Sequence, residues 1–182
     1  IFLFLCSFGF ITDFDRDNDQ DLYISAGMFE GNHFVVNDGT GVFELHEPVE
    51  GDSLTVNLTS WAGTWFDMDN DGWEDLHVCT GFSTYTIWPG VFESYPSIPD
   101  KFFNNEGGIF YEENSGFFDV AALSFAAVTG DYNLDGFPDL VNNHVGVYAQ
   151  VLKAIPNDNR WVKIRLEGTV SNRDGIGAKI RV

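Results

Sequence analysis

The sequence predicts an all-β protein assembled from repeated units of about four strands each. Three acidic segments with the same internal spacing begin at residues 13, 67 and 131, and strand-like alternation of apolar and polar residues follows each of them. The chain also holds 19 glycines and 18 phenylalanines, and none of its stretches shows the 3.6-residue period of an amphipathic helix. These observations indicate β-structure throughout.

Each repeat has the same order of elements along the chain. A strand precedes the acidic segment, as in "SFGFIT" at 7–12 and "SFAAVTG" at 124–130. A second strand follows it, in "DLYISAG", "DLHVCTG" and "DLVNNHV", which start at residues 21, 75 and 139. A hairpin comes next, in "FVVNDGTGVF" at 34–43 and "KFFNNEGGIF" at 101–110, where Asn and Gly tolerate the positive φ angles of a tight turn.

Four antiparallel strands repeated in this way are the plan of a β-propeller blade. We expect a partial β-propeller of about three four-stranded blades, at about 1–50, 51–119 and 120–152, and a C-terminal β segment at 153–182. Three blades do not close a ring, so the remaining blades are expected upstream. The third hairpin departs from the pattern, because "IPNDN" at 155–159 lacks the glycine turn.

The acidic segments carry oxygen-bearing side chains at their positions 1, 3, 5 and 9. A solvated acidic tract does not require this register, whereas carboxylates at alternate positions of a tight loop converge on one point and suit a bound cation. Position 6 is Asn18, Gly72 or Gly136, which tolerate a positive φ. The predicted metal ligands are Asp13, Asp15, Asp17 and Asp21 in the first segment, Asp67, Asp69, Asp71 and Asp75 in the second, and Asp131, Asn133, Asp135 and Asp139 in the third.

The donor set favours Ca²⁺ as the cofactor, at up to three sites. Ca²⁺ is a hard ion that takes carboxylate and carbonyl oxygens, whereas Mg²⁺ demands stricter geometry and is the second choice. Zn²⁺ is disfavoured, because no His or Cys lies inside any of the segments. Position 12 is Ile24, Val78 or Asn142 and not the bidentate Glu of an EF-hand. Asn133 lowers the charge of the third site, which we expect to bind most weakly.

Charge is distributed unevenly along the chain. The formal net charge is −19, and seven of the nine Lys and Arg residues lie in 151–182. The acidic body repels nucleic-acid phosphates and anionic membranes, so neither is expected as a partner. The apolar start, residues 1–11, is too short to span a membrane. It is interpreted mainly as a buried strand, and the stub of a signal segment is the alternative.

The pattern D-x-D-x-D-G-x-x-D-L between strands, followed by N-D-G-T-G-x-F, resembles the FG-GAP/VCBS repeats of integrin-α-type propellers. The tail at 157–182, with "SNRDGIGA" at 171–178, resembles the ASPIC/UnbV domain that follows such repeats in the cartilage acidic protein family and its bacterial relatives. The resemblance implies a secreted or cell-surface, calcium-binding scaffold and no known reaction. Its domains would be the blades at 1–152 and a truncated ASPIC/UnbV-like β domain at 153–182.

We therefore expect a non-catalytic, extracellular scaffold for adhesion or for protein or glycan interaction. The aromatic insertion at 82–100 is a candidate partner surface, through Tyr85, Trp88, Phe92 and Tyr95, and packing over a neighbouring blade is its alternative. A catalytic or non-catalytic module of a secreted polysaccharide-active enzyme, lyase- or hydrolase-like, is the alternative function. Against catalysis, the clustered aspartates are already explained as metal ligands.

Other chemistry-bearing residues are interpreted as packing or surface groups. Cys6 and Cys79 lie far apart without a CxxC pattern and are expected to be buried small hydrophobes, and no local base pairs with Cys79. The four histidines, His33, His46, His77 and His144, form no HExxH motif. Asn57-Leu58-Thr59 is a possible glycosylation sequon, and "DGIGA" at 174–178 is read as a hairpin turn.

Overall fold

The structure, a computed structural model of the chain, describes residues 8–26, 31–47, 49–50, 52–54, 59–81, 86–88, 91–92, 98–113, 116, 118, 120, 122–170, 172–178 and 180. Cys6 and the sequon at 57–59 fall wholly or partly outside these residues, as does most of the aromatic insertion at 82–100. Within the described residues, the structure contains no helix, and hence none of the length and apolarity needed to cross a membrane.

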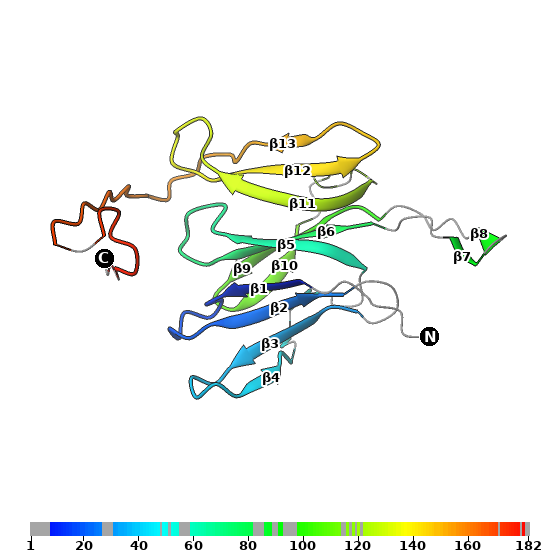
Figure 1. The fold of residues 1–182 in the computed structure, drawn as a ribbon, viewed down its shortest axis with the longest axis horizontal. Coiled ribbons are helices and arrows are strands. Elements are labelled where there is room, and N and C mark those ends of the chain that lie inside the picture. Colours follow the sequence, from blue (N-terminus) through cyan, green and yellow to red (C-terminus); the bar gives the residue numbers. More distant parts are fainter. Residues whose placement is uncertain are drawn as a thin grey trace.

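Three antiparallel sheets are stacked face to face, which confirms the predicted all-β, propeller-like fold (Figure 1). The first sheet has the order β1 (Phe8–Thr12), β2 (Asp21–Ser25), β3 (His33–Asn37) and β4 (Phe43–Leu45). The second has β5 (Ser60–Phe66), β6 (Asp75–Thr80), β9 (Lys101–Glu106) and β10 (Ile109–Glu112). The third has β11 (Leu123–Gly130), β12 (Asp139–Val145) and β13 (Gln150–Leu152), while β7 (Thr86–Trp88) and β8 (Val91–Phe92) form a separate hairpin.

The acidic segments connect the first two strands of each sheet. The pairs Thr12–Asp21, Phe66–Asp75 and Gly130–Asp139 face each other across these strands, so every segment closes a hairpin. We call them the first acidic loop (13–21), the second acidic loop (67–75) and the third acidic loop (131–139). All three lie at the same end of the stacked sheets, on the left in Figure 1.

An aromatic core fills the interface between the first and second sheets. Phe14 packs edge-on against Phe34, with ring centroids 4.7 Å apart, and stacks on Phe110 of β10 at 5.8 Å. Tyr23, Leu76 and Val78 complete the cluster with little or no exposed surface. The fourth strand of the second sheet is therefore necessary to this core, because it supplies Phe110.

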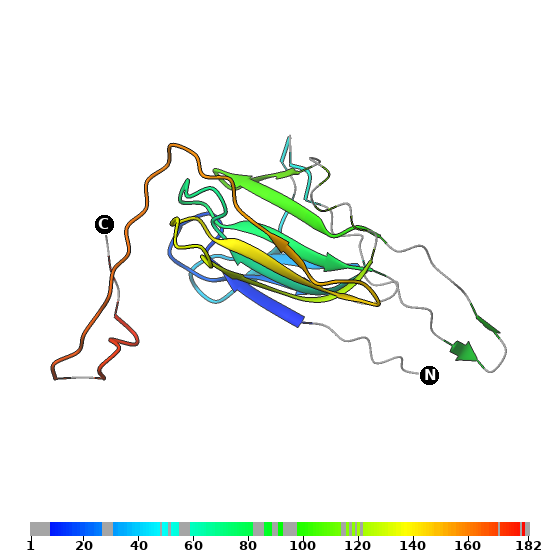
Figure 2. The same cartoon turned by 90° about the horizontal axis from the view of Figure 1, so that it is seen from above.

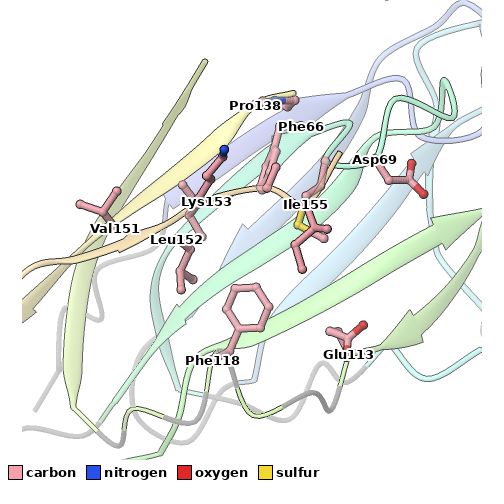
Figure 3. A pocket seen from close by; sticks show the side chains of 12 residues that line it. Phe66, Asp69, Glu113, Phe118, Pro138, Val151, Leu152, Lys153 and Ile155 are labelled. Carbon is pink, nitrogen blue, oxygen red and sulfur yellow. The ribbon is translucent and has the colours of Figure 1, made fainter. Parts of the chain in front are cut away.

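The interface between the second and third sheets has a smaller core and a pocket. Phe102 stacks on Phe118 at 5.0 Å beside Phe66 and Leu140. A cavity of about 460 Å³ opens next to them, lined mainly by apolar side chains, with Asp69 and Glu113 on one side and Val151 on the other (Figure 3). In the described residues the third sheet has three strands and so has no counterpart of β10, the strand that supplies Phe110 in the second sheet.

The described residues after Leu152 form no strand, which differs from the predicted C-terminal β segment. Beyond Ile155, which still lines the pocket, the chain runs as an extended segment past the ends of the sheets, at the left of Figure 2. Its alternation, in "WVKIRLEG" at 161–168, suits a strand, and Trp161, Val162 and Ile164 remain about half exposed or more. A β-strand needs a neighbour for its N–H and C=O groups, and the described residues provide none here.

Candidate metal centres

The aspartate at position 9 of each acidic loop is buried and accepts two backbone hydrogen bonds. Its Oδ2 accepts from the N–H of loop position 2, which is Phe14 (3.3 Å), Met68 (2.9 Å) or Tyr132 (3.1 Å). Its Oδ1 accepts from the N–H of Asn37 (3.0 Å), Asn105 (2.9 Å) or Ala154 (3.0 Å), each within two residues of the end of the third strand. Asp21, Asp75 and Asp139 therefore tie each loop to its sheet, a structural role beyond the predicted ligand role.

The side chains at positions 1, 3 and 5 fold inward onto the backbone of their own loop. In the second acidic loop, Asp67 Oδ1 and Asp69 Oδ1 both accept from the Asp71 N–H at 3.0 Å. In the third acidic loop, Asp131 Oδ1 and Asn133 Oδ1 accept from the Asp135 N–H, also at 3.0 Å. The two loops share one conformation, in which the backbone winds around side-chain oxygens.

Left-handed backbone at positions 4 and 6 makes this winding possible. Position 6 has φ values of 77° at Asn18, 94° at Gly72 and 92° at Gly136, which agrees with the residue types expected there. Position 4 also has a positive φ, at Arg16 (62°), Asn70 (59°) and Leu134 (62°). The residue types at position 4 do not predict this second bend, because only Asn70 is a residue type that favours a left-handed backbone.

In two of the three loops, three carboxylates lie close enough together to ligate one metal ion. Within the described residues, ligand oxygens of Asp13, Asp15 and Asp21 lie within 4.8 Å of one another, as do those of Asp67, Asp69 and Asp71. Positions 1 and 3 belong to both clusters. The third acidic loop forms no such group of three, because Asn133 stands at its position 3. Asp17, Asp75, Asp131, Asp135 and Asp139 lie in their loops outside these clusters.

Electrostatics favour a positive charge at these clusters. Burial raises the pKa of Asp75 to about 7 and that of Asp21 to about 6, against the lowering effect of their two backbone N–H donors. Burial, followed by the charges of neighbouring carboxylates, also raises the pKa of Asp15, Asp67 and Asp69. Carboxylates this close ionise together more readily when a cation offsets their repulsion, so the all-oxygen donor set fits a hard divalent ion.

Asp19, at position 7 of the first acidic loop, is a candidate ligand that the sequence analysis missed. Its Oδ1 is buried without a hydrogen-bond partner among the described residues. Burial and the charges of Asp17, Asp15 and Asp13 raise its pKa. Position 7 is aromatic in the other two loops, Trp73 and Phe137, so the shared pattern concealed this additional carboxylate.

Adjacent loops contact each other through position 4 of one and position 6 of the next. Asn70 Nδ2 donates to the Gly136 carbonyl at 3.0 Å. Arg16 packs against Gly72, since a Cβ at Gly72 would lie 3.1 Å from its guanidinium. The guanidinium carbon also lies 5.2 Å from the centre of the Trp73 ring. The three loops therefore form a continuous row.

The chain's own C-terminal segment continues this row. Asn157 and Asn159 both donate through Nδ2 to the Asp69 carbonyl, at 2.8 and 3.0 Å. The Trp161 ring covers Gly136, where any Cβ would lie within 1.7 Å of a ring carbon. Residues 157–161 therefore cross the second and third acidic loops.

A buried polar cluster joins the second and third sheets through Ser124, Asp100 and His144. Ser124 Oγ donates to Asp100 Oδ2 at 2.8 Å and lies 2.9 Å from His144 Nδ1. Asp100 also accepts from the Thr80 N–H at 2.7 Å and from the Asn142 side chain. In a Ser-His-Asp triad the imidazole lies between acid and hydroxyl, whereas here the hydroxyl lies between the other two. The arrangement therefore suits a role in packing, as predicted for His144.

Cys79 is buried and free, as predicted for it, but the expectation that it has no nearby base was wrong. Its Sγ lies 4.0 Å from His77 Nδ1 and 3.6 Å from Asn142 Oδ1. The alternation of strand β6 explains this contact, since residues 77 and 79 share one face. Burial raises the pKa of the Cys79 thiol, and burial followed by the charge of His144 lowers that of His77 to about 3. A protonated thiol beside a neutral imidazole is a packing pair and not an activated nucleophile.

A comparison with known families identifies part of the chain. Residues 13–78 match the sequence profile of the FG-GAP-like repeat family. These residues carry an FG-GAP-like repeat. The matched FG-GAP-like region begins at the first residue of the first acidic loop and ends in β6, so it contains both carboxylate clusters. None of the curated proteins compared with the chain matches it.

Proposed function

We propose that this chain is part of an extracellular, calcium-binding β-propeller scaffold that supports adhesion or protein or glycan interaction and is non-catalytic. The observation that supports it most is the pair of carboxylate clusters in the first and second acidic loops, which share loop positions 1 and 3 and lie inside an FG-GAP-like repeat. FG-GAP repeats commonly bind Ca²⁺ and occur in extracellular and cell-surface proteins. The resemblance of 157–182 to an ASPIC/UnbV domain supports the same assignment.

The residues proposed to hold Ca²⁺ are Asp13 and Asp15, with Asp21 and Asp19, in the first acidic loop, and Asp67, Asp69 and Asp71 in the second. A bound divalent ion supplies the positive charge that lets these carboxylates ionise side by side. The chain's part is to orient them, through the inward backbone bonds and the position-9 anchor, so that a rigid row of loops presents its outer surface to a partner. The insertion at 82–100 is the proposed partner surface.

Calorimetric titration with Ca²⁺ and thermal melts test this function. At a hundredfold excess over Kd, each filled site adds about 2.7 kcal/mol to the free energy of unfolding. With about 2–4 °C for each kcal/mol, the melting temperature rises by about 5–10 °C per site. We expect D67A/D69A to lose Ca²⁺ binding at the second acidic loop and the part of the rise in melting temperature that this site contributes.

The control is E44A/E50A, which removes two exposed carboxylates outside the loops and is expected to titrate like the wild type. If folded protein shows no heat of Ca²⁺ binding and no thermal shift, the proposed function is wrong. Equal shifts for the two double variants would show instead that Ca²⁺ acts through net charge and not through the loops.

A further inference from the structure

The third acidic loop differs from the second in the surroundings of its position-5 carboxylate. Asp135 Oδ2 lies 3.3 Å from the Lys153 ammonium and accepts from Asn133 Nδ2 at 2.8 Å, while Oδ1 accepts from the Phe137 N–H at 3.1 Å. Both oxygens of Asp135 therefore have nitrogen donors. The position-5 carboxylate of this loop is therefore paired with a cation from the segment after β13.

Asp71, the counterpart in the second acidic loop, lacks this second set of donors. Its Oδ1 accepts from the Trp73 N–H at 2.8 Å, which corresponds to the Asp135–Phe137 bond. No donor to its Oδ2 is found in the part of the chain that the structure describes. Asp71 is instead grouped with Asp67 and Asp69 within 4.8 Å. The two loops thus share one backbone conformation, but within the described residues the position-5 carboxylate is paired with a cation in the third acidic loop and not in the second.

The position of Lys153 in its repeat explains why only one loop is neutralised in this way. Lys153 directly precedes Ala154, whose N–H bonds the position-9 aspartate, and so corresponds to Val36 and Asn104 in the first two sheets. Neither of those side chains carries a charge. A long cationic side chain at this point reaches the loop, where a short neutral one does not.

We propose that the Lys153 ammonium takes the place of a divalent cation in the third acidic loop, so that the chain binds such cations in the first and second acidic loops alone. The inference rests on the proposed calcium function and specifies which loops perform it. The ammonium lies 3.3 Å from Oδ2 of Asp135, a predicted metal ligand, so it would repel a dication bound to that carboxylate over a few ångströms. The Lys153 side chain is 52% exposed, so its removal leaves no buried cavity.

Titration calorimetry with Ca²⁺ on the whole chain tests the proposal. The wild type is expected to bind two ions, with any third-loop binding weaker by at least about tenfold, since a dication must displace the ammonium. K153V/N133D reproduces the acid set of the second acidic loop and is expected to bind three ions. K153V alone should show intermediate third-loop affinity, and K153R, which keeps the charge, should bind two.

Several outcomes would overturn the proposal while leaving the calcium function intact. One is three ions of similar affinity in the wild type. Another is two ions in K153V/N133D, with circular dichroism and melts showing that the variant folds like its parent. D69A is the matched reference, since it should remove one ion from every background. An absence of binding in all variants, the wild type included, would overturn the calcium function and this inference together.

Discussion

Two interfaces separate the three sheets, one between the first and second sheets and one between the second and third. They have the same backbone arrangement but are packed with different side chains. In the first, position 2 of the acidic loop is Phe14, which stacks on Phe110 from the fourth strand. In the second, position 2 is Met68, no fourth strand is present among the described residues, and a cavity of about 460 Å³ remains. The difference shows that the outermost strand of a blade completes the apolar core as well as the sheet.

The two interfaces also differ at the end opposite the acidic loops. Asn32 Oδ1 accepts from Ser60 Oγ at 2.6 Å and from the Ala26 N–H at 2.9 Å. Asp100 takes the same place in the second interface, with Ser124 and Thr80 as donors. One interface is thus held by a neutral amide and the other by a carboxylate between two histidines, His77 and His144.

The largest effect that separates the interfaces is expected from truncating Phe110. F110A removes a fully buried ring that touches Phe14 and Phe34, and should cost about 3–5 kcal/mol of unfolding free energy. F118A, at the edge of the pocket, should cost less, about 2 kcal/mol, because one side of its ring already lacks neighbours. Urea denaturation measures both. Equal losses would show that the pocket does not weaken the second interface.

The difference between the interfaces also shows what the sequence can and cannot predict. The hairpins, the strand order and the acidic loops follow from patterns within one repeat. The structure confirms them in the first two sheets, whereas the third sheet has three of its four expected strands in the described residues. The contacts of Asn70 with Gly136 and of Ser124 with Asp100 join separate repeats, and the contact of Lys153 with Asp135 depends on a position at which the repeats differ in residue type. When the repeats are aligned with one another, one residue of each contact falls at a position where the residue type varies. The shared pattern therefore does not predict these contacts. Each contact that the repeat pattern did not predict is thus made by a residue that differs from one repeat to the next.

A pH dependence is expected to reside in the second interface. Burial raises the pKa of Asp100 above its ordinary 3.8, although the Thr80 N–H and the Ser124 and Asn142 side chains oppose the rise. The folded state therefore keeps a proton that the unfolded state has lost. The stability from this group is fully present below the unfolded pKa and is lost as the pH rises through the folded one.

D100N removes this titration, so the free energy of unfolding of the wild type minus that of D100N should fall as the pH rises above 3.8, the ordinary pKa of the group. The groups that face Asp100 include His77, whose pKa is near 3, and His144, and both are retained in the variant. N32D makes the reverse change in the first interface. The unfolding free energy that it removes should grow with pH, by about 1–3 kcal/mol in all, because a buried carboxylate becomes ionised. A flat difference for both variants would refute the expectation. Urea denaturation at fixed Ca²⁺ measures it.

The smallest effect is expected from exchanging the residues at loop position 2. M68F places in the second interface the ring that Phe14 supplies to the first, and the cavity beside Met68 has room for it. The added apolar contact should stabilise the chain by about 1 kcal/mol. F14M makes the opposite exchange in a filled core and should cost about 1–2 kcal/mol, since Met cannot reproduce the stacking on Phe110. If M68F destabilises the chain as much as F14M does, the cavity does not accommodate a phenyl ring in the way that the first interface does. The two interfaces would then differ in their backbone arrangement as well as in their side chains.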